Sequence, residues 1–162
     1  MDALGKSPIP LPMLILGKLT MAGSWSFFFL KSEDASLLLY DSVLTQMIGI
    51  LLALVGLVIV VFGFVFLGRS VAVGLPEEYT ELKTGGIYRF TRNPIYLGVF
   101  LICAGSCIFA IHTLNFLLCA TTIAIHHWIV TREEQFLEKR FGQAWVEYRR
   151  RVSRYIGQSR GI

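Results

Sequence analysis

The feature that most constrains this chain is a run of uncharged residues, VLTQMIGILLALVGLVIVVFGFVFL, from Val43 to Leu67. A helix over these residues is about 37 Å long at 1.5 Å per residue, whereas the hydrocarbon core of a bilayer is about 30 Å thick. A soluble domain of 162 residues does not need an apolar helix of this length. The run predicts a membrane-spanning helix over residues 43–68, and therefore a membrane protein.

A second long segment, residues 95–130, also carries no Asp, Glu, Lys or Arg. It is too long for one span, and its length suits two short ones. The most polar point along it is the sequence IHTLN, residues 111–115, where the break is expected. We therefore predict spans over residues 94–111 and 114–131.

The fourth candidate span covers residues 9–30 and is interrupted by Lys18. A signal peptide is the alternative interpretation, because Lys6 precedes the apolar residues, but no convincing small-residue cleavage site follows. We find no internal repeat and no low-complexity linker, so residues 1–162 are expected to form one domain. The predicted fold class is all-α, a polytopic membrane helix bundle with about four transmembrane helices.

The distribution of basic residues predicts the orientation of these spans. Arg and Lys concentrate in segments 69–93 and 132–162, whereas segment 31–41 holds one basic residue against three acidic ones. The positive-inside rule places the first two segments in the cytoplasm, and four spans then leave both termini there. The net charge of +4 reflects this topology and contact with anionic lipid headgroups, so no nucleic-acid partner is expected.

Apolar residues recur every three to four positions in the tail, which predicts an amphipathic helix beyond the last span. Arg and Lys lie between them, so the helix is suited to the interface of the inner leaflet. Two roles remain open for it, an anchor on the membrane surface and a cover that closes a site. The apolar positions are Leu137, Phe141, Trp145, Tyr148 and Val152.

The sequence TRNPIYLG, residues 91–98, contains the first candidate site residues. Asn93 suits a helix N-cap and Pro94 the first helical position, so the start of a helix alone explains this pair. Arg92, however, stands beside a helix N-terminus whose free N–H groups and dipole favour an anion. The combination predicts a seat for a carboxylate or a phosphate.

Two neighbouring acids, Glu133 and Glu134, follow the last predicted span. Acids on helix surfaces usually have a basic residue three or four positions away, and neither of these does. On a continuous helix, His126 and His127 precede them by seven residues, or about 10.5 Å along the same face. We therefore expect a cation from elsewhere to contact the acids. The histidines are weaker candidates for contacts with the same ligand.

The three cysteines, Cys103, Cys107 and Cys119, all fall within predicted spans. Cys103 and Cys107 share a helix face and flank the small residues Ala-Gly-Ser, which allow membrane helices to approach closely. Packing is the expected role of these cysteines. No Cys/His spacing in the chain indicates a metal site.

Two sequence blocks, TGGIYRFTRNPIYLG and REEQFLEKRFGQAWVEYRRRVSRYI, together resemble the isoprenylcysteine carboxyl methyltransferase and phospholipid methyltransferase superfamily of integral membrane enzymes. The similarity runs from Thr84 to Ile156, with a short apolar hairpin between the blocks. Each piece is common by itself, whereas their order and the intervening hairpin are specific. The first two predicted spans carry no distinctive match.

The resemblance implies that S-adenosylmethionine binds at the cytoplasmic ends of the last helices. It assigns catalytic and cofactor-binding roles to Arg92, Asn93, Glu133 and Glu134. The sulfonium and ammonium of the cofactor suit unpaired carboxylates, and its carboxylate suits Arg92. Further cofactor contacts expected from the resemblance are Tyr88, Pro94, Tyr96, Gly98 and, as a weaker candidate, His126.

The resemblance also implies a lipid-borne or hydrophobic methyl acceptor, with the activity most like isoprenylcysteine carboxyl O-methylation. Asn93 stands where many prenylcysteine-methylating members have His, and amine-methylating relatives also carry Asn there. Phospholipid amine N-methylation is therefore the alternative, and a non-catalytic membrane protein that kept the fold is the second. The small residues around Gly105 either leave a gap through which the acceptor enters or pack tightly. The oligomeric state is left open.

Overall fold

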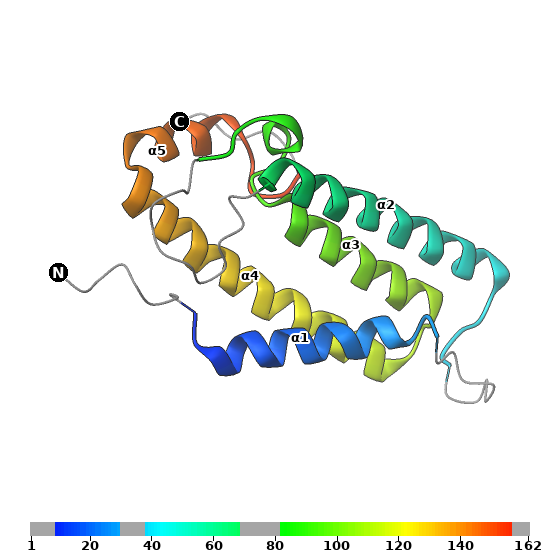
Figure 1. Ribbon diagram of the computed structural model, residues 1–162. Coiled ribbons are helices and arrows are strands. Elements are labelled where there is room, and N and C mark those ends of the chain that lie inside the picture. The colour runs from blue at the N-terminus through cyan, green and yellow to red at the C-terminus, as the bar shows by residue number, and fades with distance from the viewer. Residues whose placement is uncertain (1–8, 30–37, 69–81, 157–162) are drawn as a thin grey trace.

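The computed structural model describes residues 9–29, 38–68 and 82–156, and these form helices with no strand (Figure 1). The predicted all-α class is confirmed. The helices in chain order are α1 (Leu11–Ser26), α2 (Val43–Leu67), the short 3-10 helix η3 (Gly86–Arg89), α3 (Pro94–Phe109), α4 (Thr113–Phe141) and α5 (Gln143–Arg151).

Two helices in the described residues are long and apolar enough to cross a membrane, α2 and α4. The break between α3 and α4 falls at Ala110–His112, where the polar sequence predicted it. Each of α1 and α3 has 16 residues, or about 24 Å of helix. α1 starts after Pro10 and ends at Ser26, so it is shorter than the predicted span over residues 9–30, and residue 30 lies outside the described residues. The four-span arrangement therefore remains a prediction.

α2 packs against α3 along a line of glycines spaced seven residues apart, Gly49, Gly56 and Gly63. A Cβ atom at Gly56 would lie 2.6 Å from the carbonyl oxygen of Gly98, and one at Gly98 would lie 2.5 Å from that of Gly56. The two backbones are in contact, which only glycine allows. Gly98 and Gly105 of α3 are thus tightly packed against α2, so between these two helices the structure shows the second of the two alternatives, close packing.

α1 packs against α4 on the other side of the bundle, and a buried polar network joins both helices to α3 (Figure 1). The Ser24 hydroxyl donates to Asn115 Oδ1 at 2.9 Å, and Asn115 Nδ2 donates to the Ser106 carbonyl oxygen at 3.0 Å. All of these groups are buried, so each hydrogen bond replaces one that water would otherwise supply. The expected packing role of the cysteines is confirmed by an adjacent core cluster that contains Cys103, Cys107 and Cys119.

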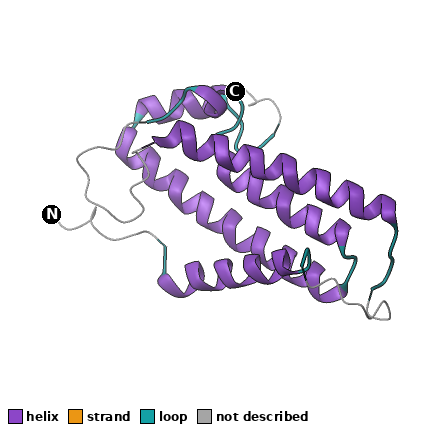
Figure 2. Cartoon of the chain, turned by 45° about the vertical axis from the view of Figure 1, so that its right-hand side comes forward, coloured by secondary structure: helices purple, strands orange, loops and turns teal. Residues whose placement is uncertain are grey.

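α4 continues beyond the membrane-spanning part, as the sequence predicts. Its 29 residues measure about 43 Å, so the charged end from Arg132 to Phe141 projects past the predicted span. Gly142 then turns the chain into α5 with a φ of 54°, a conformation that favours glycine. η3 and α5 together cover the end of the bundle where α3 begins and α4 ends (Figure 2).

The apolar face of α5 is buried inside the protein. Trp145, Tyr148 and Val152 form a core cluster that packs against Leu82, Leu137 and Phe141. The tail forms an amphipathic helix as predicted, although Leu137 and Phe141 belong to α4. Of the two roles left open for it, an anchor whose apolar face lies on the inner leaflet does not fit, because that face is buried within the protein. The physical reason is that α4 and the segment before η3 offer the same residues an apolar surface within the chain.

Candidate active site

The start of α3 is arranged differently from a simple helix cap. Pro94 occupies the first helical turn, as predicted, but the Asn93 side chain makes no capping hydrogen bond. The hydroxyl of Thr91 accepts the Asn93 backbone N–H at 3.2 Å instead. Asn93 Nδ2 donates to Glu134 Oε1 at 2.9 Å, across to α4. The predicted N-cap role of the Asn93 side chain is therefore wrong, since the carboxylate competes for it.

Glu134 is the centre of a buried ion cluster. Its carboxylate accepts hydrogen bonds from Arg92 Nε at 3.2 Å and from Arg154 Nη2 at 2.8 Å, and only 5% of the residue is exposed. Burial alone would raise the pKa of Glu134, but the hydrogen bond from Arg154 and the positive charge of Arg92 outweigh it and hold the pKa below its usual value. The expected cation from elsewhere is thus supplied by the chain itself.

Arg92 is fully engaged in this cluster. Nε and Nη2 donate to Glu134, and Nη1 donates to the carbonyl oxygens of Arg149 at 3.1 Å and Val152 at 2.6 Å. The guanidinium also lies 5.8 Å from the centre of the Trp145 ring. The expectation that Arg92 seats the carboxylate of a cofactor does not fit this geometry, because its charge and its donors are already used.

Glu133 differs sharply from its neighbour. Its carboxylate accepts a hydrogen bond from the Tyr96 hydroxyl, which donates to Oε1 at 2.9 Å. Among the residues that the structure describes, it has no Lys or Arg partner within ion-pair distance. Burial raises the pKa of Glu133 above its usual value, more than the Tyr96 hydrogen bond lowers it, and the charge of Glu134 raises it further. This carboxylate is available to a cationic ligand.

His126 lies next to Tyr96 and completes an aromatic wall. The centres of the two rings are 6.0 Å apart, and α1 approaches the imidazole so closely that a Cβ at Gly17 would lie 3.1 Å from its Cε1. His126 Nδ1 lies 2.8 Å from the carbonyl oxygen of Thr122. A carbonyl only accepts, so Nδ1 carries the proton, and in the neutral ring Nε2 has a free lone pair.

The segment after α5 passes across the start of α3 and holds the site together. The Arg92 backbone N–H donates to the Ser153 carbonyl oxygen at 3.0 Å, and the Thr91 hydroxyl donates to that of Arg154 at 3.0 Å. The ring centre of Tyr155 lies 5.3 Å from that of Phe100 and 5.9 Å from that of His127. We call residues 152–155 the C-terminal strap.

The strap residues Arg154 and Tyr155 are the site residues that the sequence analysis missed. Both lie inside the second sequence block, but nothing in the local pattern assigns them a partner. The one available signal was that Glu134 needed a cation and that the tail is rich in arginine. The sequence could not show which arginine reaches it, because the contact joins residues 20 positions apart across a turn.

Two of the expected site residues make no hydrogen bond to either carboxylate. Gly98 faces α2, where its lack of a side chain is required by Gly56, so it packs a helix interface. Tyr88 is buried, and its hydroxyl donates to the carbonyl oxygen of Gly63 in α2 at 3.4 Å, while its own carbonyl accepts from Tyr148 at 2.7 Å. Pro94 begins α3 beside these residues. The structure therefore brings together six of the expected site residues: Arg92, Asn93, Tyr96, His126, Glu133 and Glu134.

Comparison with known families places the sequence. A sequence model described as phospholipid methyltransferase matches residues 44–144, which is more than half of the chain. No curated protein matches the chain. The matched segment includes the glutamate pair and Tyr96, and it ends before Arg154 and the rest of the C-terminal strap.

Proposed function

The chain belongs to the phospholipid methyltransferase family, and from this premise we propose that it transfers a methyl group from S-adenosylmethionine to a lipid-borne or hydrophobic acceptor. The family and the apolar helices make it a membrane methyltransferase; the cofactor and the acceptor are the proposal. The observation that carries the proposal is the carboxylate of Glu133, which is desolvated, hydrogen-bonded by Tyr96 and without a cationic partner in the described residues.

The donor set around Glu133 fits a sulfonium cofactor. An unpaired carboxylate suits the ammonium or the sulfonium, and the ring of Tyr96, whose centre lies 6.0 Å from that of His126, offers a face that attracts a cation. Glu134 does not fit as a direct contact, because both of its oxygens are occupied by Arg92, Asn93 and Arg154. We assign Glu134 a positioning role, since its ion pair holds the start of α3 against α4.

S-adenosylmethionine, when bound, supplies a methyl group that is already activated by the adjacent sulfonium. The residues of this chain then need only orient the reactants and exclude water. Tyr96 orients the Glu133 carboxylate, and Glu133 would hold the positive charge of the cofactor away from water. The C-terminal strap fixes the start of α3, which carries Tyr96.

An amine is the acceptor that the geometry favours. An amine must lose a proton before or during methyl transfer, and the Nε2 lone pair of His126 in the Nδ1–H form is suited to accept it. The second candidate is a lipid-borne carboxylate, which needs no base and is favoured by the similarity of the sequence blocks to isoprenylcysteine carboxyl methyltransferases.

The test is labelled methyl transfer by the purified full chain in lipid nanodiscs. S-adenosylmethionine with a radioactive methyl group is offered with total membrane lipid in one reaction and with a farnesylcysteine analogue in another. A base-stable labelled lipid identifies an amine acceptor, whereas methanol released by alkali identifies a carboxylate. Calorimetric titration with S-adenosylmethionine measures cofactor binding separately.

The matched variants are Glu133→Gln and, as a control, Glu138→Gln on the same helix, where the residue forms an exposed pair with Arg149. We expect E133Q to weaken cofactor binding by about tenfold or more, since a hydrogen bond or ion pair to a charged group is worth about 1.5–3 kcal/mol. E138Q should bind as the wild type does. Equal binding by all three proteins would show that Glu133 does not contact the cofactor, whereas no binding by the wild type would favour a non-catalytic membrane protein.

A further inference from the structure

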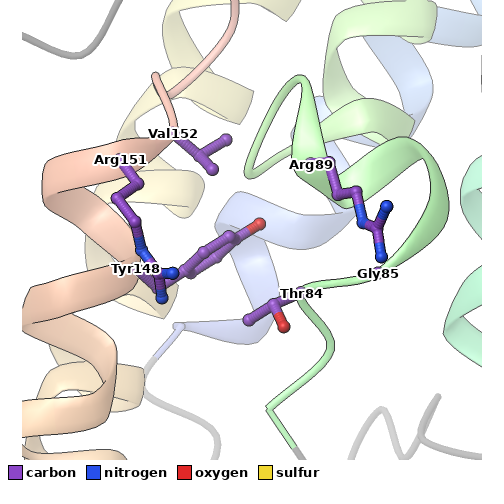
Figure 3. A pocket seen from close by; sticks show the side chains of 6 residues that line it. All are labelled: Thr84, Gly85, Arg89, Tyr148, Arg151 and Val152. Carbon is purple, nitrogen blue, oxygen red and sulfur yellow. The ribbon is translucent and has the colours of Figure 1, made fainter.

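A cavity of about 410 Å³ lies between η3 and α5 (Figure 3), and neither Glu133 nor Glu134 lines it. Val152 belongs to both places, the cavity and the ion cluster around Glu134. The side chain of Val152 lines the cavity, while its carbonyl oxygen accepts from Arg92 on the other side. The lining residues are Thr84, Gly85, Arg89, Tyr148, Arg151 and Val152.

Two arginines give this cavity a positive charge. Arg89 and Arg151 come from its two opposite sides, and no acidic residue lines it (Figure 3). Neither arginine has a carboxylate partner within the described residues. Arg151 Nε donates to the carbonyl oxygen of Glu147 at 3.4 Å, which leaves its two Nη groups for a ligand.

The end of α5 does not cancel this charge. Unpaired carbonyl groups at a helix C-terminus normally repel an anion. Here the Tyr148 carbonyl accepts from the Val152 N–H at 3.0 Å, and the Arg149 carbonyl accepts from Arg92 Nη1 at 3.1 Å. Two of the last carbonyls of α5 are thus paired with donors, and the charged groups that line the cavity are the two guanidinium groups.

We propose that this cavity binds a phosphate group between Arg89 and Arg151. Guanidinium groups present paired N–H donors that match phosphate oxygens. Thr84 adds a hydroxyl group to the lining of the cavity. The volume falls within the range of about 300–1,000 Å³ that is typical of small-molecule sites, so it admits a headgroup as well as a free ion. This site goes beyond the proposed function, since the binding of phosphate in the cavity does not require methyl transfer.

The source of the phosphate is either a phospholipid headgroup or a soluble phosphate. η3 and α5 lie at the end of the bundle that the positive-inside rule assigns to the cytoplasm, which is the level of the headgroups. A lipid phosphodiester can therefore enter from the bilayer, and inorganic phosphate from the water. The two sources are separated by the choice of probe.

The experiment titrates the full chain in neutral detergent with two probes, inorganic phosphate and short-chain phosphatidylglycerol, using short-chain diacylglycerol as the phosphate-free comparison. Calorimetry gives the affinities of the wild type, Arg89→Gln, Arg151→Gln and Arg150→Gln. Arg150 is the matched control, because it is exposed and adjacent in sequence but does not line the cavity. We expect R89Q and R151Q each to bind about tenfold more weakly, as charge-assisted hydrogen bonds are lost, and R150Q to bind like the wild type.

Tighter binding of phosphatidylglycerol than of inorganic phosphate identifies a headgroup, the reverse order identifies a soluble phosphate, and both results support the site. Three results overturn it. The first is absence of binding by either probe, and the second is an equal loss in R150Q, which indicates attraction to the basic tail in general. The third is displacement of the phosphate probe by S-adenosylmethionine, which makes the cavity part of the cofactor site. If the protein fails to transfer a methyl group, the result of the phosphate titration is unaffected, so the two proposals are tested separately.

Discussion

Glu133 and Glu134 are adjacent in the chain, yet the structure gives them opposite environments. Glu134 accepts hydrogen bonds from two arginines and an asparagine, whereas Glu133 accepts one from a tyrosine. The sequence predicted that a cation meets these acids and that they face the start of α3. It could not show that the cation belongs to Glu134 alone. Successive residues of a helix point in directions that differ by about 100°, so one of the two acids is buried beside the arginines and the other is not. Which one is buried depends on the segments that pack against α4.

The first prediction concerns stability at this pair. Glu134→Gln removes the negative charge that compensates two arginines, of which Arg92 is buried and Arg154 is about one-third exposed. We expect a loss of about 2–3 kcal/mol in the free energy of unfolding, discounted for the exposure of Arg154. Thermal unfolding in detergent should show a clearly lower Tm for E134Q than for E133Q.

The same variant should alter the dependence of stability on pH. The pKa of Glu134 is lowered in the folded protein, so its contribution is present above the unfolded value of about 4.5 and is lost as the pH falls through the lower folded value. Wild-type Tm should therefore fall in acid more steeply than that of E134Q. Parallel curves for the two proteins would contradict the ion cluster.

The second prediction concerns cofactor binding and pH. Burial raises the pKa of Glu133, so this carboxyl is protonated to a higher pH than an ordinary glutamate. A cation binds only its ionised form, so the affinity for S-adenosylmethionine should increase as the pH rises through this raised pKa, with release of a proton. Calorimetry in buffers of different ionisation enthalpy measures the proton release. E133Q should show neither the pH dependence nor the release, and a wild type without them would show that Glu133 does not contact the cation.

At the scale of elements, the hydrophobic runs and their punctuation predicted most helix positions. The start of α3 at Pro94 and the break around His112 follow from one proline and one polar sequence. The sequence did not show that α3 turns its small residues toward α2. A row of glycines indicates close packing, but it does not show which helix packs there. That helix is α2, because its glycines lie opposite those of α3.

The third prediction tests this interface. In Gly56→Ala the new Cβ would stand 2.6 Å from the Gly98 carbonyl oxygen, a backbone atom that cannot move aside, so α2 and α3 must separate. We expect a destabilisation of about 1–3 kcal/mol, measured as a lower Tm in detergent. Gly23→Ala on α1 is the matched control, because its Cβ would meet the flexible end of Leu118 at 3.3 Å. Equal Tm values for the two variants would refute the close contact between backbones.

At the scale of the whole molecule, the bundle has one polar end that carries both the glutamate pair and the phosphate cavity. The charge distribution predicted this polarity, since the described parts of the basic segments, residues 82–93 and 132–156, lie at this end. The sequence could not predict that the strap crosses α3, because its hydrogen bonds join residues about 60 positions apart and depend on the turn at Gly142.

The fourth prediction concerns topology. Four spans and the positive-inside rule place both ends of the 162-residue chain in the cytoplasm, although α1 and α3 are short. Reporter proteins that are active on only one side of the membrane, fused separately to each end, measure this directly. Both fusions should report the cytoplasm. Opposite sides for the two ends would require an odd number of spans and would remove α1 or α3 from the bilayer.

The position of the strap also has a consequence for biosynthesis. Arg154 and Tyr155 follow every helix that the structure describes, so a ribosome translates them after the residues of those helices. A nascent chain that ends before residue 152 can therefore possess its membrane helices while Glu134 still lacks one of its two arginines. Maturation of this protein is thus expected to have two stages, insertion first and assembly of the reaction centre afterwards.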